Sequence, residues 1–249
     1  MTTLLTYNIH GLPWNNINVQ KIAEWIFILA KPKVICLQEV FSKKHRDYFV
    51  NYAEYQGYTA VYPTDTTCIP WMECGSGLLI LLHPSVTLLS EPIFEPFQNV
   101  NGIDRLVSKG YFKVNLRHGL HDFQLFNTHM QSDVTEFWCY RLNYNLARSE
   151  QEKELFLAAS KEDHPLVIGD MNMSEFECFE KLDPTFHVTF PGTDEHLDHL
   201  LVLSRDSNKT EHIETIYHEN VPWSDHVPVI YTVRFQRRNP SRGNVATLF

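Results

Sequence analysis

The sequence has few cysteines, fewer basic than acidic residues and no long hydrophobic run. Its five cysteines form no Cys-x-x-Cys pair in 249 residues, which excludes a disulfide scaffold and argues against a structural zinc site. Lys and Arg number 21 against 30 Asp and Glu, for a net charge of −9, so a large basic face for non-specific nucleic-acid binding is not expected. The apolar runs are far shorter than the roughly 20 residues of a membrane-spanning helix.

What the sequence does contain is typical of a folded globular protein. Hydrophobic residues make up 43% and charged residues 20% of the chain, a composition that excludes disorder. We expect one domain over residues 1–235 and a loose basic tail over residues 236–249. We expect a monomer. Because Met1 leads straight into a strand-like run and not into a signal peptide, we expect the protein to be cytoplasmic or peripheral to a membrane. A secreted mature form is the alternative. A bridge between Cys68 and Cys74 stays open for an oxidising compartment.

Strand and helix patterns alternate along the whole chain without a linker. This mixture predicts an α/β sandwich of two central sheets flanked by helices. The expected strands are Thr3–Asn8, Val34–Gln38, Thr59–Tyr62, Gly77–His83, Val86–Pro92, Lys109–Leu116, Asp122–His129, Leu166–Ile168, Leu197–Ser204 and Val227–Phe235. The expected helices are Val19–Ala30, Lys43–Gln56, Arg141–Ser160 and a short one at Glu175–Lys181.

Polar side chains follow several predicted strands at the point where an apolar run ends. Sheets of α/β proteins build their sites in this way, by delivering a carboxylate to the tip of a buried strand. One such residue is readily explained as a loop cap, but six coincidences favour a common site. The positions are Asn8, Glu39, Asn127–His129, Asp170 with Asn172, Asp198, and Asp225 with His226.

The donor atoms at these positions point to a hard cation. Amide and carboxylate oxygens without cysteine suit magnesium, which proteins bind through one or two carboxylates together with substrate phosphate. Glu39 with Asn8 would form such a site, and manganese is a possible substitute for magnesium. His226, next to acidic partners, is a candidate general base. Zinc is the rival ion, but no His-Glu-x-x-His spacing is present.

Five short motifs together resemble the endonuclease/exonuclease/phosphatase superfamily. Their order and spacing match from about Leu4 to Val233, nearly the whole chain. The resemblance implies a four-layered, DNase I-like α/β sandwich and magnesium-dependent cleavage of phosphoester bonds. The motifs are Tyr7-Asn8-Ile9-His10-Gly11, Leu37-Gln38-Glu39-Val40, Asn127-Thr128-His129-Met130-Gln131, Gly169-Asp170-Met171-Asn172 and Ser224-Asp225-His226-Val227-Pro228.

Within that superfamily the sequence is most similar to the neutral sphingomyelinases. The run from His10 to Pro13 fits that branch, Asp104 with Lys109 matches its Asp-x-x-x-x-Lys pair, and Arg148 begins an Arg-x-x-Gln step. Two features depart from the branch. Met130 replaces the more usual leucine, and the aromatic hairpin that secreted bacterial members insert into membranes is not found.

The resemblance implies a role for each matching residue. Glu39 binds the catalytic magnesium, with Asn8 and Asp225 beside the metal. His129 and Asn172 donate hydrogen bonds to the phosphate. Asp170 orients the attacking water or helps to deprotonate it, and His226, held by Asp198, is the general base. Asp104, Lys109 and Arg148 arrange the site or bind the substrate.

The substrate is the least determined property, and three hypotheses remain. The first is hydrolysis of sphingomyelin to ceramide and phosphocholine; the second is a DNase or abasic-site endonuclease; the third is an inactive binding module. The loops Tyr62–Ser76 and Gln131–Tyr140 contain several aromatic residues and no Lys or Arg. Such loops favour a phospholipid headgroup over a nucleic-acid duplex, because an aromatic cage attracts the choline cation.

Overall fold

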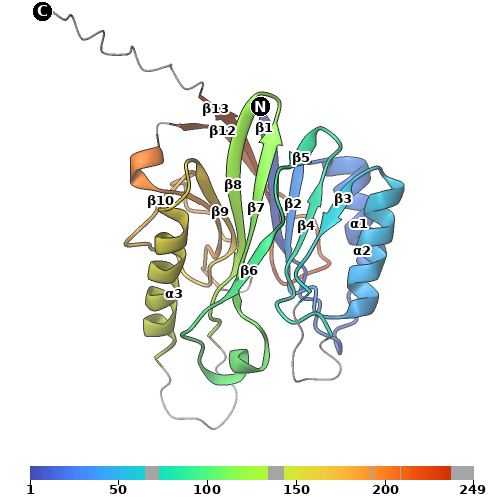
Figure 1. Ribbon diagram of the computed structural model, residues 1–249. Coiled ribbons are helices and arrows are strands. Elements are labelled where there is room, and N and C mark those ends of the chain that lie inside the picture. The colour runs from blue at the N-terminus through green and yellow to red at the C-terminus, as the bar shows by residue number, and fades with distance from the viewer. Residues whose placement is uncertain (65–72, 134–142, 192, 208, 237–249) are drawn as a thin grey trace, which may run out of the picture.

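Two β-sheets pack face to face between helices in the computed structural model (Figure 1). The structure describes residues 1–64, 73–133, 143–191, 193–207 and 209–236. Helices α1 and α2 lie outside one sheet and α3 lies outside the other, which gives the four predicted layers. The predicted fold class is therefore confirmed.

The first sheet contains six strands in the order β12-β13-β1-β2-β4-β3. Its central pair, β1 and β2, is parallel, and the other pairs are antiparallel. The strands are β12 (Thr210–Tyr217), β13 (Val229–Phe235), β1 (Thr2–Asn8), β2 (Val34–Gln38), β4 (Leu79–Leu82) and β3 (Thr59–Val61).

The second sheet follows the order β10-β11-β9-β8-β7-β5, and β6 also pairs with β7. Here β8 and β9 are the parallel pair. The strands are β10 (Glu180–Lys181), β11 (Asp198–Val202), β9 (Pro165–Asp170), β8 (His121–His129), β7 (Gly110–His118), β5 (Val86–Leu88) and β6 (Ile93–Pro96).

Three longer helical segments cover the sheets. Helix α1 (Val19–Glu24) continues as a π-helical stretch, Trp25–Ala30, so the predicted helix Val19–Ala30 is present with a wider second half. The other two are α2 (Lys43–Tyr55) and α3 (Tyr144–Ala159). Short 3₁₀ turns occupy Gly102–Leu106 and Ser204–Asp206.

Strand alternation distributes the apolar side chains over three layers of core. Leu4 of β1 and Phe123 of β8 belong to the cluster between the sheets. The next residue of β1, Leu5, faces the opposite way and packs in one cluster with Phe49 of α2. On the far side of the second sheet, Leu155 of α3 belongs to a third cluster. Because both faces of the central strands are buried, these strands are nearly continuous apolar runs.

The two parallel strand pairs deliver their carboxyl ends to one edge of the sandwich. Asn8 lies opposite Gln38 at the end of β1 and β2, and His129 lies opposite Asp170 at the end of β8 and β9. Gln38 Nε2 donates a 2.8 Å hydrogen bond to Asn127 Oδ1, which ties the two sheets together beneath this edge. Polar residues far apart in the sequence therefore meet there.

Three expectations about secondary structure were wrong. Residues 175–179 form no helix, and only Glu180–Lys181 of that segment is regular, as the short edge strand β10. Strands β6 and β12 were not predicted. In β12 the register against β13 shifts between His212 and Glu214; this bulge breaks the two-residue alternation that identifies a strand.

Three other expectations have a limited outcome. Among the described residues, no helix is long and apolar enough to cross a membrane. Cys68 lies outside the described residues, so a bridge to Cys74 stays a prediction. The tail over residues 237–249 also lies outside them, and the division at residue 235 is untested.

Gly169 gives a direct test of the contact between β8 and β9. Its φ is +144°, and a Cβ there would lie 2.0 Å from the Thr128 carbonyl oxygen. We expect Gly169→Ala to lower the free energy of unfolding by roughly 4 kcal/mol or more, because backbone must move. Gly119→Ala is the control, since its Cβ meets nothing within 4 Å, and it should cost about 1–2 kcal/mol for its positive φ. Equal losses in urea titrations would contradict this account.

Candidate active site

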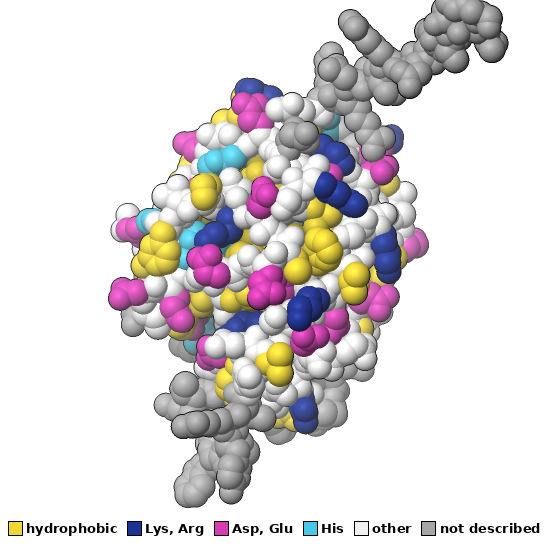
Figure 2. Space-filling view, turned by 90° about the vertical axis from the view of Figure 1, so that its left-hand side faces the viewer, with side chains coloured by type: hydrophobic (Ala, Val, Ile, Leu, Met, Phe, Trp, Pro, Cys, Tyr) yellow, Lys and Arg dark blue, Asp and Glu magenta, His cyan; other side chains and the backbone are white. Residues whose placement is uncertain are grey.

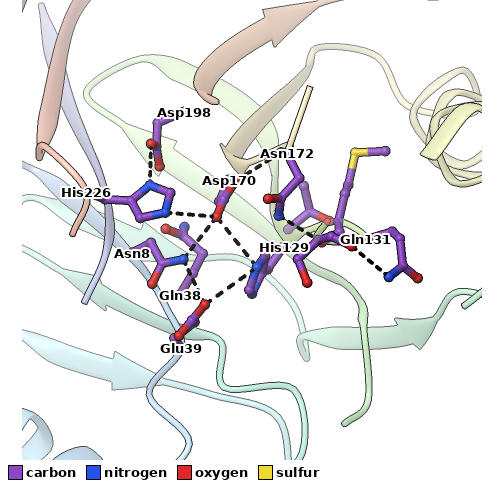
Figure 3. Close-up of polar contacts among 12 residues, drawn as sticks. Asn8, Gln38, Glu39, His129, Gln131, Asp170, Asn172, Asp198 and His226 are labelled. Atoms are coloured by element: carbon purple, nitrogen blue, oxygen red, sulfur yellow. Dashed lines mark hydrogen bonds and ion pairs between the residues drawn. The ribbon is translucent and has the colours of Figure 1, made fainter. Parts of the chain in front are cut away.

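Asp170 is the centre of the polar cluster at the sheet edge (Figure 3). Its Oδ2 accepts a 2.9 Å hydrogen bond from Asn8 Nδ2 and lies 3.5 Å from His129 Nε2 and 3.6 Å from His226 Nε2. Although burial alone would raise the pKa of Asp170, the imidazoles of His226 and His129 lower it overall. Asp170 is thus a carboxylate that the Asn8 amide and the His226 imidazole hold from two different segments, with the His129 ring beside it.

Glu39 is the residue best suited to bind a cation. It follows β2 in the left-handed region, with φ 58°, and its Oε1 accepts from Asn8 Nδ2 at 3.1 Å. Its Oε2 is buried and has no hydrogen-bond partner among the described residues. Burial raises the pKa of the Glu39 carboxyl, although Lys109 and Asn8 oppose the shift. A bound cation would satisfy the open oxygen and offset the cost of burying this charge.

The ligand set at Glu39 fits magnesium better than zinc. Within the described residues, no group of three or more His, Cys, Asp or Glu side chains is arranged to hold an ion. Zinc needs three or four protein ligands, whereas magnesium commonly takes one or two carboxylates and completes its shell with water and phosphate. Glu39 meets that smaller requirement.

The two other predicted metal ligands are engaged elsewhere. Asn8 Oδ1 accepts from the backbone N–H of His10 at 3.0 Å, so the amide nitrogen of Asn8 faces Glu39 and Asp170. As placed here, Asn8 orients both carboxylates and offers the metal no free oxygen. Asp225 Oδ2 pairs with His10 Nδ1 at 3.1 Å, with about a third of each side chain exposed. A direct metal bond from either residue stays a prediction.

Sequence reasoning gave no role to His10 or to Ser224, yet the structure places both at the site. Ser224 Oγ donates to the Asn8 carbonyl at 2.6 Å and to Asp225 Oδ1 at 3.2 Å. Each lies within two residues of a polar strand-end position, which was the available signal.

His226 lies between two carboxylates. Its Nδ1 is 2.8 Å from Asp198 Oδ2, and its Nε2 faces Asp170. Burial lowers the pKa of His226, but Asp198 and Asp170 more than reverse this and raise it to about 10. Asp198 comes from the start of β11, which is antiparallel to β9 with Asp198 opposite Asp170. The predicted pairing of His226 with Asp198 is thus present, and it orients the ring toward Asp170.

His129 and Lys109 form a second buried pair on the other side of Asp170. Lys109 Nζ lies 2.7 Å from His129 Nε2, donates to the Met130 carbonyl at 2.9 Å and lies 3.6 Å from Asp104 Oδ2. Burial and the Lys109 charge lower the pKa of His129 to about 3. A neutral His129 therefore accepts a hydrogen bond from Lys109 at Nε2, so its predicted donation to phosphate requires that this contact change on binding.

Asn172 and Arg148 both bind backbone near His129. Asn172 Nδ2 donates to the Met130 carbonyl at 3.1 Å. The Arg148 guanidinium is buried, donates to the Gln131 carbonyl at 3.1 Å and binds Asp133 through two nitrogens. Arg148 accordingly arranges the segment after β8. The predicted aromatic loops fall largely on residues 65–72 and 134–142, outside the described residues.

Solved structures resemble this fold over nearly the whole chain, whereas no protein-family model and no curated protein matches the sequence. Sphingomyelinase C from Streptomyces griseocarneus has a TM-score of 0.66 at 20% identity, over 92% of this chain and 98% of that one. A Staphylococcus aureus beta toxin mutant with bound magnesium ions has 0.70 at 18%, over 95% and 99%. D. rerio TDP2 complexed with a single-strand DNA product has 0.70 at 16%, over 94% and 98%.

The superfamily resemblance is confirmed at the level of the fold. An endonuclease/exonuclease/phosphatase protein from Beutenbergia cavernae also matches, with a TM-score of 0.71 at 14% identity, over 94% of this chain and 71% of that one. The chain therefore has the fold of that superfamily. Because one matching structure is a sphingomyelinase and another contains DNA, the fold leaves the substrate open.

The His226 ion pair predicts how stability depends on pH in metal-free protein. Its pKa of about 10 in the fold lies above the unfolded value near 6.5, so its contribution is complete below about pH 6.5 and is lost as pH rises toward 10. In chelator, the free energy of unfolding of the wild type should therefore exceed that of His226→Gln, and this difference should shrink from pH 6 to pH 9.5. A difference that stays constant or grows in urea titrations would contradict the assignment.

Proposed function

We propose that the chain is a metal-dependent phosphodiesterase. The observation that carries this proposal is the convergence of Glu39, Asp170 and the Asp198–His226 pair at one edge, where each has a different partner set. A binding module without catalysis has no need of a buried His–Asp pair aimed at a second carboxylate, because burying such charges is costly. The intact set therefore argues against the inactive alternative.

Glu39 would hold the metal, which we propose is magnesium, with manganese as a substitute. A divalent cation there supplies positive charge against the phosphoryl and leaving oxygens during displacement. The magnesium ions in the structurally similar beta toxin support this choice.

The residues of the chain divide the remaining work. Asp170 orients the attacking water, and His226 takes its proton at Nε2 once the imidazole is deprotonated, with Asp198 fixing the ring through Nδ1. His129 borders the same space, 3.9 Å from Glu39 Oε1. It and Asn172 would donate to a phosphate oxygen once the substrate displaces their contacts with Lys109 and the Met130 carbonyl. Such positioning, together with stabilisation of charge, supplies most of the rate in phosphoryl transfer.

We further propose a choline phospholipid as substrate, sphingomyelin first, with ceramide and phosphocholine as products. The support is the resemblance to neutral sphingomyelinases, the structural match to sphingomyelinase C and the net charge of −9. On the side of the molecule where α3 lies, the face seen in Figure 2, Lys and Arg side chains are interspersed with Asp and Glu and form no continuous basic stripe. A duplex-binding enzyme needs such a stripe to contact successive phosphates.

A nuclease is the second candidate, favoured by the match to TDP2 with its DNA product. Lipid hydrolysis would place the chain at a membrane surface as a peripheral protein. We propose that the protein acts there as a monomer.

Glu39→Gln tests the metal assignment. The variant keeps the shape of the side chain but removes the charge, so hydrolysis in magnesium should fall at least about a hundredfold, about 2.7 kcal/mol of barrier. Thermal stability should stay the same or rise, since burial already disfavours the ionised carboxyl. The exposed Glu91→Gln serves as control. Residual activity above about a tenth of wild type would remove Glu39 from this role.

The substrate proposal is tested by offering both substrate classes to one preparation. Purified protein is incubated at physiological salt with sphingomyelin vesicles and, separately, with supercoiled plasmid, each in magnesium and in chelator. We expect magnesium-dependent release of phosphocholine and intact plasmid. Plasmid nicking without phosphocholine would instead establish the nuclease alternative, and activity on neither substrate would count against a phosphodiesterase.

A further inference from the structure

Gln131 is a fully buried residue two positions after His129, and hydrogen bonds engage all its polar groups. Its side-chain Nε2 donates to Asp104 Oδ2 at 2.9 Å, and its Oε1 accepts from the backbone N–H of Asn101 at 2.7 Å. Its own backbone N–H and carbonyl are bound by side chains of α3. So many bonds at one buried residue fix the local backbone in a single position.

Gln151 supplies the bond to the backbone N–H of Gln131. It is fully buried, one turn beyond Arg148 on α3. Its Oε1 accepts from Gln131 N at 2.9 Å, and its Nε2 donates to the carbonyl of Asn99. Gln151 thus joins α3 to two loop segments at once, and among the described residues it forms no hydrogen bond with Asp170, Glu39 or His226.

The segment held in this way carries a carbonyl that two site residues share. The Met130 carbonyl accepts from Lys109 Nζ at 2.9 Å and from Asn172 Nδ2 at 3.1 Å. Asp104 Oδ2, which Gln131 binds, also accepts from Ser132 N at 2.8 Å and lies near Lys109. A shift of this backbone would therefore displace Lys109, Asn172 and His129 together.

A purely structural role for the two glutamines is the competing explanation. Gln151 pairs a backbone N–H and a backbone carbonyl, and an apolar side chain would leave both without a partner and lower stability. A purely structural role therefore predicts that kcat falls only when stability falls. A role in precision predicts a further loss of kcat, because errors of about 1 Å in catalytic geometry cost on the order of a hundredfold in rate.

We propose that Gln151, acting through Gln131, is a positioning residue that sets the phosphate-facing side of the active site. It holds the Met130–Ser132 backbone so that Lys109 and Asn172 are placed by one carbonyl. This inference rests on the proposed phosphodiesterase function for its effect on rate, but its effect on the backbone of residues 130–132 can be observed without any substrate.

Three variants of Gln151 test separately whether the side chain must be long enough to reach Gln131 N and whether it must be polar. Gln151→Met removes both hydrogen bonds at nearly constant volume. Gln151→Asn stays polar but is one methylene too short to reach Gln131 N. Gln151→Glu keeps the reach and the acceptor for Gln131 N and loses the Nε2 donor to the Asn99 carbonyl. Phe49→Leu is the control, because Phe49 is fully buried on α2 in the apolar cluster outside the first sheet, which contains none of residues 130–132, so the change lowers stability without touching this segment.

Each protein is tested for amide hydrogen exchange at residues 130–132 and for thermal stability. Its kcat and KM are measured on sphingomyelin vesicles in magnesium. For the Met and Asn variants we expect exchange at least tenfold faster at 130–132 and kcat at least tenfold lower, with KM within threefold of wild type. Gln151→Glu should stay within threefold of wild type in kcat. Phe49→Leu should lose stability but keep both kcat and the exchange rate at residues 130–132.

The outcomes are distinguishable. If the Met variant does not fold, the Asn and Glu variants decide, since both remain polar. Loss of kcat in Phe49→Leu that matches the Gln151 variants at equal loss of stability would overturn the positioning role. So would unchanged exchange in Gln151→Asn. If wild type hydrolyses no phosphodiester, the proposed function fails, while exchange at 130–132 still decides whether Gln151 positions this backbone.

Discussion

The burial of three carboxylates at one edge of the sandwich is the constraint on which the site depends. Glu39, Asp170 and Asp198 come from three different strand ends and lie within a few ångströms of imidazole or amide donors. Removing such charges from water costs several kcal/mol each unless partners replace the lost solvation. Asn8 donates to Glu39 and Asp170, and His226 lies between Asp170 and Asp198. A change in any one of these residues therefore alters the partners of the others.

The network also requires both sheets to be in place, because its members alternate between them. Asn8 and Glu39 come from the first sheet, Asp170 and Asp198 from the second, and His226 just before β13 of the first. The Gln38–Asn127 hydrogen bond and the apolar layer beneath it hold the two edges in register. The site can therefore form only when the sandwich folds. Burial of apolar surface between the two sheets offsets the free-energy cost of bringing the carboxylates together.

The sequence predicted the parts of this arrangement that depend on local pattern. Strands such as β2 are short apolar runs that end in a polar residue, so both the strand and the position of Glu39 were readable. The same reasoning failed for β12, where a bulge interrupts alternation, and for Glu175–Lys181, where tertiary pairing overrides helical periodicity. Contacts such as His10 with Asp225 join distant segments, and a pattern in one segment holds no information about its partner.

Substrate choice has a different physical origin from the reaction. Strand register fixes the positions of the reactive groups, because a shift by one residue would turn every side chain of a strand to its other face. The same fold occurs in a sphingomyelinase and in a protein complexed with DNA. Discrimination between a lipid headgroup and a polyanion must then come from the segments that connect the strands around this edge. In this chain, the sequences Tyr62–Ser76 and Gln131–Tyr140 combine aromatic and acidic residues with no Lys or Arg. The backbone that follows β8 is bonded to Gln151 and Arg148 of α3. Selectivity can therefore change by substitution in the loops, provided that the backbone after His129 stays where α3 sets it.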